Sequence, residues 1–459
     1  MKRARWSVGL LLTVHFPLIT HHSPLTTSLH AQSLAVTHVT VIDGSDSTPR
    51  LDQTVLIRSG RIVAVGPARS TAIPRGATVV PGQGRYLIPG LWDMHVHLDV
   101  PRGRELLGLY VANGVLGVRD LAGDWLRLSG WRREVAAGRL VGPRLFLSGP
   151  YLEGGDVPIP HLLARTPAEA VAAVDSLVRL GVDVVKLHTQ LNRESYLAAA
   201  SAARRRGLRV AGHVPRTVSA AEASDSGVGS IEHMLRIPVP CTRAESLRLA
   251  PRFAVQRVLA ECSSGDPNPL FRTLVRNRTR VVPTLAPALE IASWPRRDVP
   301  GDASAAFLPD TLKRFVAAIF PMPADVPPGA DSIGRLLFEK RLALVGTLHR
   351  AGVDILTGTD APLRNSPPGF GLHQELALLV RAGLSPFQAL RSATLLPAQY
   401  FGIQDSIGRI APNMVADLVL LGGNPLRNIG NTRRIEAVIL RGQLLDRGGL
   451  QRLFDRARR

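Results

Sequence analysis

The middle of the sequence, residues 87–360, alternates short apolar runs with longer amphipathic stretches. Patterns with helical spacing, such as residues 167–180 and 193–206, lie between most of the apolar runs. Strands that alternate with helices are typical of βα units around a parallel sheet. Eight candidate strands predict a (β/α)8 TIM-like barrel of the α/β class; they are residues 87–98, 114–121, 143–152, 182–189, 208–214, 229–234, 279–285 and 353–360.

Strand-like segments with alternating polarity also lie on both sides of this region. Residues 34–86 contain several of them, and residues 417–421 and 437–442 have the same texture. We therefore expect one small β-sandwich domain built from both chain ends. The predicted organisation is a first β part at 32–86, a barrel at 87–402, a second β part at 403–447 and a C-terminal tail at 448–459.

Two connections within the barrel region are much longer than usual. Residues 236–278 and 288–350 follow the sixth and seventh candidate strands and combine apolar helical patterns with proline-rich pieces. Long connections after barrel strands lie over the active-site face. These two insertions are therefore candidates for a lid.

The amino terminus resembles an export signal. Lys2, Arg3 and Arg5 precede a mostly apolar stretch at residues 6–20, and we expect residues 1–31 to be a signal peptide. An uncleaved anchor is the alternative. No later stretch has eighteen unbroken apolar residues, so we expect an exported, periplasmic or extracellular protein without stable membrane insertion after signal removal. Export would permit a disulfide between the two cysteines, Cys241 and Cys262, but two cysteines do not specify their own pairing.

The net charge of +20 raises the question of nucleic-acid binding. The basic residues are spread along the whole chain without a long cationic arm, and aromatic residues make up only 5% of it. Base-stacking platforms need more aromatic side chains than this. The charge pattern indicates a solvated, arginine-rich surface and no nucleic-acid partner.

The first candidate barrel strand ends in two histidines, His95 and His97. Side chains at positions i and i+2 of a strand point to the same face, so both imidazoles would project together. Two convergent ring nitrogens are a common start to a zinc site. Paired histidines also occur on surface strands, so this pair needs further support.

That support comes from four residues at the ends of other candidate strands: Lys186, His213, His233 and Asp360. Barrel active sites are built at the carboxyl ends of the strands. Each residue alone has another explanation, because a strand-end histidine is often structural and Asp360 could cap the following turn. Six such side chains at the same end of different strands predict a metal centre.

Lys186 is the most informative of these residues. The chain contains 56 lysines and arginines, yet only four of them are lysines, and Lys186 lies inside an apolar run. A buried lysine tends to lose its charge, and a neutral amine can add carbon dioxide to form a carbamate able to bridge two cations. Arginine keeps its proton and cannot do this. A structural ion pair is the alternative.

Seven motifs together are similar to those of the amidohydrolase superfamily, and more narrowly to its imidazolonepropionase-like and Xaa-Pro dipeptidase-related metal-dependent hydrolases. The motifs lie at residues 89–97, 185–187, 212–214, 231–233, 282–285, 357–361 and 408–419. The resemblance covers nearly the whole chain after the signal segment. It implies a barrel with a β-sandwich domain, and divalent metal ions, commonly zinc.

The resemblance also implies a ligand set. It assigns His95, His97 and Asp360 to a more buried metal ion, and His213 and His233 to a more exposed one. It implies carbon dioxide as a second cofactor, in the form of a carbamate on the lysine at residue 186 that bridges the two ions. A hydroxide shared by the ions would attack a carbonyl carbon while Asp360 acts as general base and then general acid.

The expected reaction is hydrolysis of a carbon–nitrogen bond in a dipeptide, an N-acyl amino acid or a cyclic amide. A lactonase or phosphotriesterase could use the same dinuclear site. A deaminase would use one metal ion without the bridging lysine, and a non-catalytic relative would only hold metal. The expected partner is a small-molecule substrate, and a homo-oligomer is compatible with the sequence.

Candidates for substrate contacts are fewer. Related dipeptidases have a Gly-Gly-His segment after the third strand, whereas this chain has Leu-Glu-Gly-Gly-Asp at residues 152–156. Because of this departure, the resemblance does not by itself imply Xaa-Pro specificity. His188 shares a strand face with the lysine two residues earlier, and either contacts substrate or supports another side chain. Tyr151 and Arg364 could bind a substrate carboxylate, with surface placement as the alternative. Motifs support no role for three other histidines, His161, His349 and His373.

Overall fold

The structure is a computed structural model that describes residues 33–240, 262–263, 265–292, 303–319, 330–362 and 367–458. The predicted signal segment, Cys241 and Arg364 lie outside these residues. Export, the disulfide and the Arg364 contact therefore stay predictions. Within the described part of the chain, no helix has both the length and the apolar character needed to cross a membrane.

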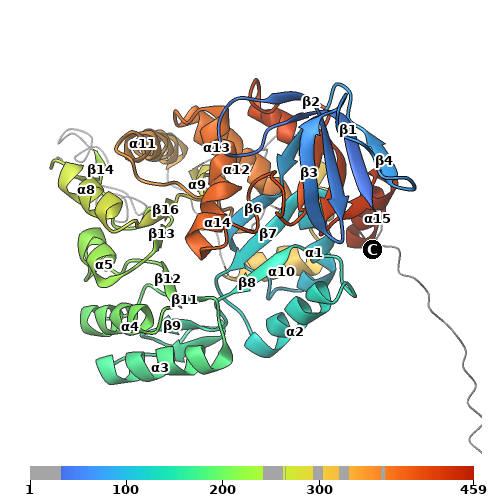
Figure 1. The fold of residues 1–459 in the computed structure, drawn as a ribbon. Helices are drawn as coiled ribbons and strands as arrows, with labels where there is room; N and C mark the ends of the chain where they lie inside the picture. The colour runs from blue at the N-terminus through green and yellow to red at the C-terminus, as the bar shows by residue number, and fades with distance from the viewer. Residues whose placement is uncertain are drawn as a thin grey trace, which may run out of the picture.

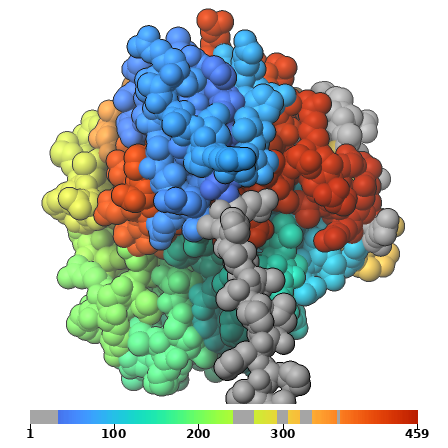
Figure 2. Space-filling model, turned by 45° about the vertical axis from the view of Figure 1, so that its right-hand side comes forward, coloured from blue at the N-terminus to red at the C-terminus, as the bar shows by residue number. Residues whose placement is uncertain are grey.

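Strands from both chain ends form one eight-stranded sheet (Figure 1). Its order is β19-β18-β17-β5-β1-β2-β3, with β4 paired to β1. The two ends meet where β17 pairs antiparallel with β5. The strands are β1 Leu34–Val41, β2 Arg50–Arg58, β3 Arg61–Pro67, β4 Thr78–Pro81, β5 Tyr86–Pro89, β17 Leu418–Leu421, β18 Ile435–Leu440 and β19 Gln443–Leu445. Figure 2 shows the amino-terminal segment in blue beside the carboxyl-terminal segment in red.

Parallel strands make up the second part of the fold. One sheet has the order β6-β7-β8 and the other has the order β10-β9-β11-β12-β13-β16. Most of these strands are fully buried, as expected for a parallel sheet covered by helices. They are β6 Leu91–Val96, β7 Val115–Asp120, β8 Arg144–Leu147, β9 Tyr151–Glu153, β10 His161–Leu163, β11 Val184–Leu187, β12 Arg209–Gly212, β13 Ser230–Glu232 and β16 Arg280–Val282.

Individual backbone contacts connect the two parallel sheets. On one side the amide of Asp183 donates to the carbonyl of Leu147 at 2.9 Å. On the other side, isolated parallel bridges join Val281 to Ile355 and Val96 to Ala361. The α/β class and the order of the strands agree with the prediction. The described residues form two parallel sheets that are joined by isolated bridges. They do not form the single continuous sheet of a closed eight-stranded barrel.

Three predicted strands differ from the structure. Residues 87–98 divide at Gly90 into β5 and β6, which belong to different sheets. A Cβ atom at Gly90 would lie 2.7 Å from the Leu116 side chain, so this crossing requires glycine. Residues 143–152 divide into β8 and β9. Residues 353–360 form single bridges rather than a strand, because Thr357 and Thr359 hydrogen bond through their side chains and Asp360 has a φ of 57°.

Helices cover the parallel strands, and Figure 1 shows α3, α4 and α5 in a row outside β9, β11 and β12. The helices predicted at 167–180 and 193–206 are present as α3 and α4. The long insertions contribute α8–α11, η1 and the strand pair β14 Val239–Pro240 and β15 Cys262–Ser263. The helices through α11 are α1 Gly103–Ala112, α2 Trp125–Ala136, α3 Pro167–Leu180, α4 Arg193–Arg205, α5 Ala220–Ser226, α8 Asn268–Arg276, α9 Leu285–Ala292, η1 Ala303–Phe307, α10 Asp310–Ile319 and α11 Ala330–Arg350. The later ones are α12 Phe370–Arg381, α13 Pro386–Ser392, α14 Leu395–Phe401, η2 Ile429–Arg433 and α15 Arg447–Arg458.

The predicted C-terminal tail is in fact the helix α15, which packs against α1. Leu450, Leu453 and Ala457 are buried, and their spacing of three and four residues places them on one helix face. The prediction of a tail was wrong because the segment's many arginines hide this short apolar stripe. The other domain limits stay predictions.

Candidate metal centre

Three predicted ligands meet at the carboxyl end of β6. His95 is the fifth residue of this strand, and His97 follows its last residue. The Nε2 atoms of His95 and His97 lie 3.3 Å and 3.0 Å from the same oxygen of Asp360, Oδ1. Asp360 reaches this position in a left-handed backbone conformation, in which its amide donates to the His95 carbonyl at 2.7 Å. The predicted convergence of His95 and His97 on one face is therefore present.

His233 and His213 extend this cluster from the ends of β13 and β12. The His95 and His233 rings are 4.6 Å apart between centroids, and the His233 and His213 rings are 4.9 Å apart. The group of ligand atoms that lie closest together differs from the predicted set of His95, His97 and Asp360. His95, His233 and Asp360 offer ligand atoms that all lie within 4.8 Å of one another, whereas His97 and His213 flank this group.

Each of three imidazoles is held through its Nδ1 atom. The Nδ1 atom of His95 lies 2.8 Å from Glu232 Oε2, that of His213 lies 2.7 Å from Thr189 Oγ1, and that of His233 lies 2.8 Å from Thr284 Oγ1. A partner on one ring nitrogen fixes the ring and leaves the other nitrogen for a ligand. The Nε2 atom of His95 is fully buried and has no hydrogen-bond partner among the residues that the structure describes.

Lys186 lies near the end of β11 and is 2% exposed. Burial lowers the pKa of Lys186 to about 8, although the nearby carboxylates of Glu232 and Asp360 oppose this shift. In the described part of the chain, Nζ forms no ion pair within 4 Å. Lys186 is therefore buried and close enough to His213 and His233 to lower the pKa of both. Among the described residues the alternative of a structural ion pair finds no support.

The site keeps His213 and His233 neutral and Asp360 charged. Burial and the nearby Lys186 lower the pKa of His213 well below its ordinary value, and burial lowers the pKa of His233 to about 3. Burial alone would raise the pKa of Asp360, but the imidazoles of His95 and His233 hold it well below its ordinary value. Neutral imidazoles and ionised carboxylates are the forms that bind metal ions.

Buried carboxylates on the inner side of the site were not predicted. Glu232 bonds His95 and also accepts from the fully buried Arg119 at 2.7 Å. Asp93 accepts from the backbone amide of Thr359 at 3.0 Å and from its hydroxyl at 2.6 Å, one residue before Asp360. The signal available in the sequence was the presence of charged residues inside apolar strands, as at Asp93 and Arg119.

Asp120 supports the outer edge of the site in a similar way. Its carboxylate accepts from the amides of Leu98 at 2.7 Å and Ala122 at 3.2 Å. Burial raises the pKa of Asp120 to about 7, while the nearby His97 opposes the shift. Asp120 therefore holds the backbone that directly follows His97.

The predicted substrate residues His188 and Tyr151 lie next to the predicted metal ligand His213. The His188 ring is 4.4 Å from the His213 ring and 4.6 Å from the Tyr151 ring between centroids. Its Nδ1 atom bonds the fully buried Glu153, which also accepts from the amides of Gly154 and Gln190 at 2.8 Å. Tyr151 is 3% exposed, so the alternative of surface placement was wrong for this residue.

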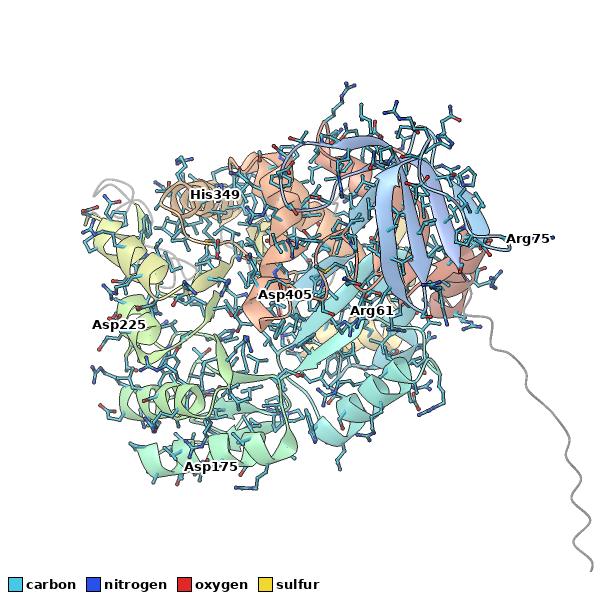
Figure 3. All side chains as sticks on the ribbon, viewed as in Figure 1. Arg61, Arg75, Asp175, Asp225, His349 and Asp405 are labelled. Atoms are coloured by element: carbon cyan, nitrogen blue, oxygen red, sulfur yellow. The ribbon has the colours of Figure 1, made fainter. Side chains whose placement is uncertain are left out.

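The histidines without a predicted role lie outside this cluster or at its edge. His373 is buried between Thr432 and the Asn113 carbonyl. His349 lies on α11 at the periphery, and Figure 3 labels it there. The His161 ring is 6.2 Å from the Tyr151 ring, and its Nδ1 bonds a backbone carbonyl in its own loop.

Comparisons with known proteins show which proteins this chain resembles. Residues 317–445 match the model of the amidohydrolase family. The predicted resemblance to amidohydrolases is confirmed. An imidazolonepropionase of Stenotrophomonas maltophilia is 43% identical over 61 residues, which cover 13% of this chain and 15% of that protein. Adenine deaminase 3 of Rhizobium meliloti is 23% identical over 403 residues, so 86% of this chain matches 55% of that protein.

Solved amidohydrolase structures match over more of the chain. A Xaa-Pro dipeptidase with bound methionine superposes with a TM-score of 0.67 at 21% identity, and the match covers 90% of this chain and 100% of that one. Bottromycin amidohydrolase superposes with a TM-score of 0.71 at 22% identity, covering 93% and 90%. At these identities the likeness establishes the fold of this amidohydrolase-like chain and leaves its substrate open.

Proposed function

We propose that the chain is an exported, metal-dependent amidohydrolase that hydrolyses a carbon–nitrogen bond in a dipeptide, an N-acyl amino acid or a cyclic amide. One observation carries this proposal. His95, His233 and Asp360 converge, and the buried Nε2 atom of His95 forms no hydrogen bond with the described residues although Asp360 Oδ1 lies 3.3 Å away. A buried polar atom without a partner is costly unless something else satisfies it.

The residues fit a divalent metal ion. Ligand atoms of a tetrahedral zinc ion with bonds of about 2.0–2.1 Å lie roughly 3.3 Å from one another. The Nε2 atoms of His95 and His97 lie 3.3 Å and 3.0 Å from Asp360 Oδ1. We infer that these three residues hold the more buried ion, that His213 and His233 hold a second one, and that zinc is the simplest choice for both.

Lys186 would connect the two ions as a carbamate. Its neutral nitrogen forms a bond to the carbon of carbon dioxide while one carbon–oxygen π pair moves to oxygen, and the nitrogen then loses a proton. The pKa of about 8 favours the neutral amine that this step needs, and the burial of Lys186 together with its effect on the pKa of His213 supports a position near the histidines. Arginine could not take its place.

The chain's own groups account for the proton transfers. When bound, divalent ions activate a water molecule as hydroxide near neutral pH and polarise the carbonyl oxygen of the substrate. Asp360 accepts the proton of that water, because its low pKa keeps it ionised, and it then gives the proton to the leaving nitrogen. His188 contacts the substrate through Nε2, since Glu153 already holds its Nδ1 atom.

Three further parts of the proposal concern the whole chain. We infer that the two parallel sheets with their bridges belong to one (β/α)8 barrel, and that the strands of both chain ends form the accessory β-sandwich domain. Hydrogen bonds on both sides of the parallel sheets support the barrel. The basic and then apolar start of the sequence supports export.

Metal analysis combined with a substrate screen tests this function. Purified protein should contain close to two zinc equivalents, and Lys186→Arg should lower this number and abolish hydrolysis while the chain stays folded. N-acyl amino acids and dipeptides should be cleaved in preference to lactones and phosphotriesters. Hydrolysis that persists in Lys186→Arg would contradict the carbamate. A lack of hydrolysis with every substrate class would favour a non-catalytic metal-binding protein.

A deaminase is the second candidate. The match to an adenine deaminase over 86% of the chain and the compact group of three ligand atoms both favour it. This candidate predicts one metal equivalent, ammonia release from a purine, and activity that does not depend on carbon dioxide. The same metal analysis therefore separates the two functions.

A further inference from the structure

Glu375 is a fully buried carboxylate that the chemistry above does not use. It lies on α12 and is 0% exposed. Its Oε1 atom accepts from the amide of Leu285 at 2.8 Å, and its Oε2 atom accepts from the amide of Ala286 at 2.7 Å. These amides belong to the first two residues of α9. The two oxygens therefore satisfy backbone donors that the helix itself cannot satisfy.

The residue immediately before this helix start contacts a metal ligand. Thr284 is 2% exposed, and its hydroxyl lies 2.8 Å from Nδ1 of His233. Thr284 has a φ of 48° and His233 has a φ of 58°, so both residues have left-handed backbone conformations that are unfavourable without support. The short helix α9 must be fixed in place for this contact to persist.

We propose that Glu375 is a positioning residue for His233: it fixes the start of α9 and, through Thr284, the direction in which the His233 Nε2 atom points. The inference rests on the proposed function, in which His233 is a metal ligand. It adds a side chain on α12 to the parts of the fold that set metal affinity. The hydrogen bonds of Glu375 go to the backbone of α9 and not to the proposed ligands.

The two acceptor oxygens and the length of the side chain both matter in this arrangement. A carboxylate offers one acceptor oxygen to each of the two amides. Glutamine would offer one oxygen and turn its NH₂ group toward the other amide, so one buried donor would lose its partner. Aspartate keeps both oxygens but is shorter by one methylene group, so it should hold the helix start less well.

Zinc binding by the full-length protein measures this positioning. Zinc is removed and then titrated back against a chromophoric chelator, with thermal unfolding recorded in parallel. Glu375→Gln should raise the dissociation constant of the weaker zinc ion about 10- to 100-fold, the usual effect of losing a group that orients a ligand. Glu375→Asp should give a smaller increase. Unchanged zinc affinity in folded Glu375→Gln and Glu375→Asp would overturn the proposal.

Thr284 variants test the route of the effect. Thr284→Val removes the hydroxyl with little change of shape and should weaken zinc to a similar extent, whereas Thr284→Ser should bind zinc like the parent protein. Because both residues act through one contact, Thr284→Val combined with Glu375→Gln should be no weaker than the worse single variant. Independent, multiplicative effects would show that Glu375 does not act through Thr284.

Asp183→Asn provides the control for loss of a carboxylate that holds backbone. Asp183 accepts from the Leu147 amide and from Arg132, both at 2.8 Å, just before β11 and away from the ligand end of this strand. This variant should lower stability without changing zinc affinity. If Asp183→Asn weakens zinc as much as Glu375→Gln, the effect is a general loss of stability and the proposal fails.

Nitrogen-15 spectra of the histidines in the zinc-free protein keep this test independent of the proposed function. We expect one defined tautomer for His233 in the parent protein and a mixture in Glu375→Gln. A parent protein that binds no zinc would refute the metal centre, and the tautomer of His233 would still decide the positioning role. An unchanged His233 spectrum in Glu375→Gln would refute that role.

Discussion

The inner and outer sides of the metal centre are held in different ways. On the inner side, His95 is fully buried and bonded to Glu232, whose other oxygen is paired with Arg119. On the outer side, the side chain of His97 is 34% exposed and that of His188 is 27% exposed. The neutral hydroxyl of Thr189 holds His213 there, in a hydrogen bond that is open to solvent.

This difference implies that folding alone orients the inner imidazole, whereas metal binding completes the orientation of the outer ones. Charged partners in a buried setting fix the inner imidazole before any ion arrives, because an unpaired charge there would be costly. The hydrogen bond between Thr189 and His213 on the outer side competes with water and fixes the imidazole less strongly. We therefore expect the inner ligands to control stability together with affinity, and the outer ligands to control affinity alone.

The largest expected effect is on the inner side. Glu232→Gln leaves the buried guanidinium of Arg119 without its anionic partner, and removing one partner of a buried ion pair costs about 3–5 kcal/mol. The midpoint of urea unfolding should fall accordingly, and zinc affinity should fall with it. Replacing both Arg119 and Glu232 by methionine is the control and should recover much of the stability. If Glu232→Gln were as stable as the parent protein, the inner side would not depend on buried charged partners, and the contrast with the outer side would be wrong.

A buried histidine far from both sides should set part of the acid sensitivity. Burial lowers the pKa of His373 to about 4, below its ordinary 6.5. Between these values the unfolded chain binds more protons than the folded one, so stability is full above pH 6.5 and is lost as the pH falls through 4. The loss attributable to this group reaches about 3 kcal/mol.

Urea unfolding of the parent and of His373→Gln between pH 4 and pH 8 measures this effect. The difference in stability between the two proteins should shrink as the pH falls. A constant difference would assign the acid sensitivity to other groups, the inner ligands among them.

The smallest expected effect is on the outer side. Thr189→Val removes the hydroxyl that orients His213 and should weaken the more exposed zinc ion about tenfold, near the lower limit for loss of such a group. Thermal unfolding without metal should stay unchanged, since the hydroxyl lies at the surface. Thr189→Ser serves as the matched control. A clear loss of stability in Thr189→Val would show that the outer side is as deeply integrated in the fold as the inner side.

The sequence alone determined which residue types lie at the carboxyl ends of the strands. His95, His97, Lys186 and Asp360 follow or lie within apolar runs, and strand periodicity is a local property that can be read without the fold. Because the carboxyl ends of parallel strands share one edge, their convergence was predictable from the order of the elements. Helices α3 and α4 were predictable for the same local reason.

Only the tertiary structure decided how these groups are held. Glu232 lies 137 residues from His95, and Asp93 lies 266 residues from Thr359, so no local pattern could reveal either contact. Glu375 lies on the buried face of an ordinary amphipathic helix, where the sequence offers no sign of what the carboxylate faces. Ligand identity follows from residue chemistry at strand ends, whereas ligand orientation follows from buried hydrogen bonds between segments that meet only when the chain has folded.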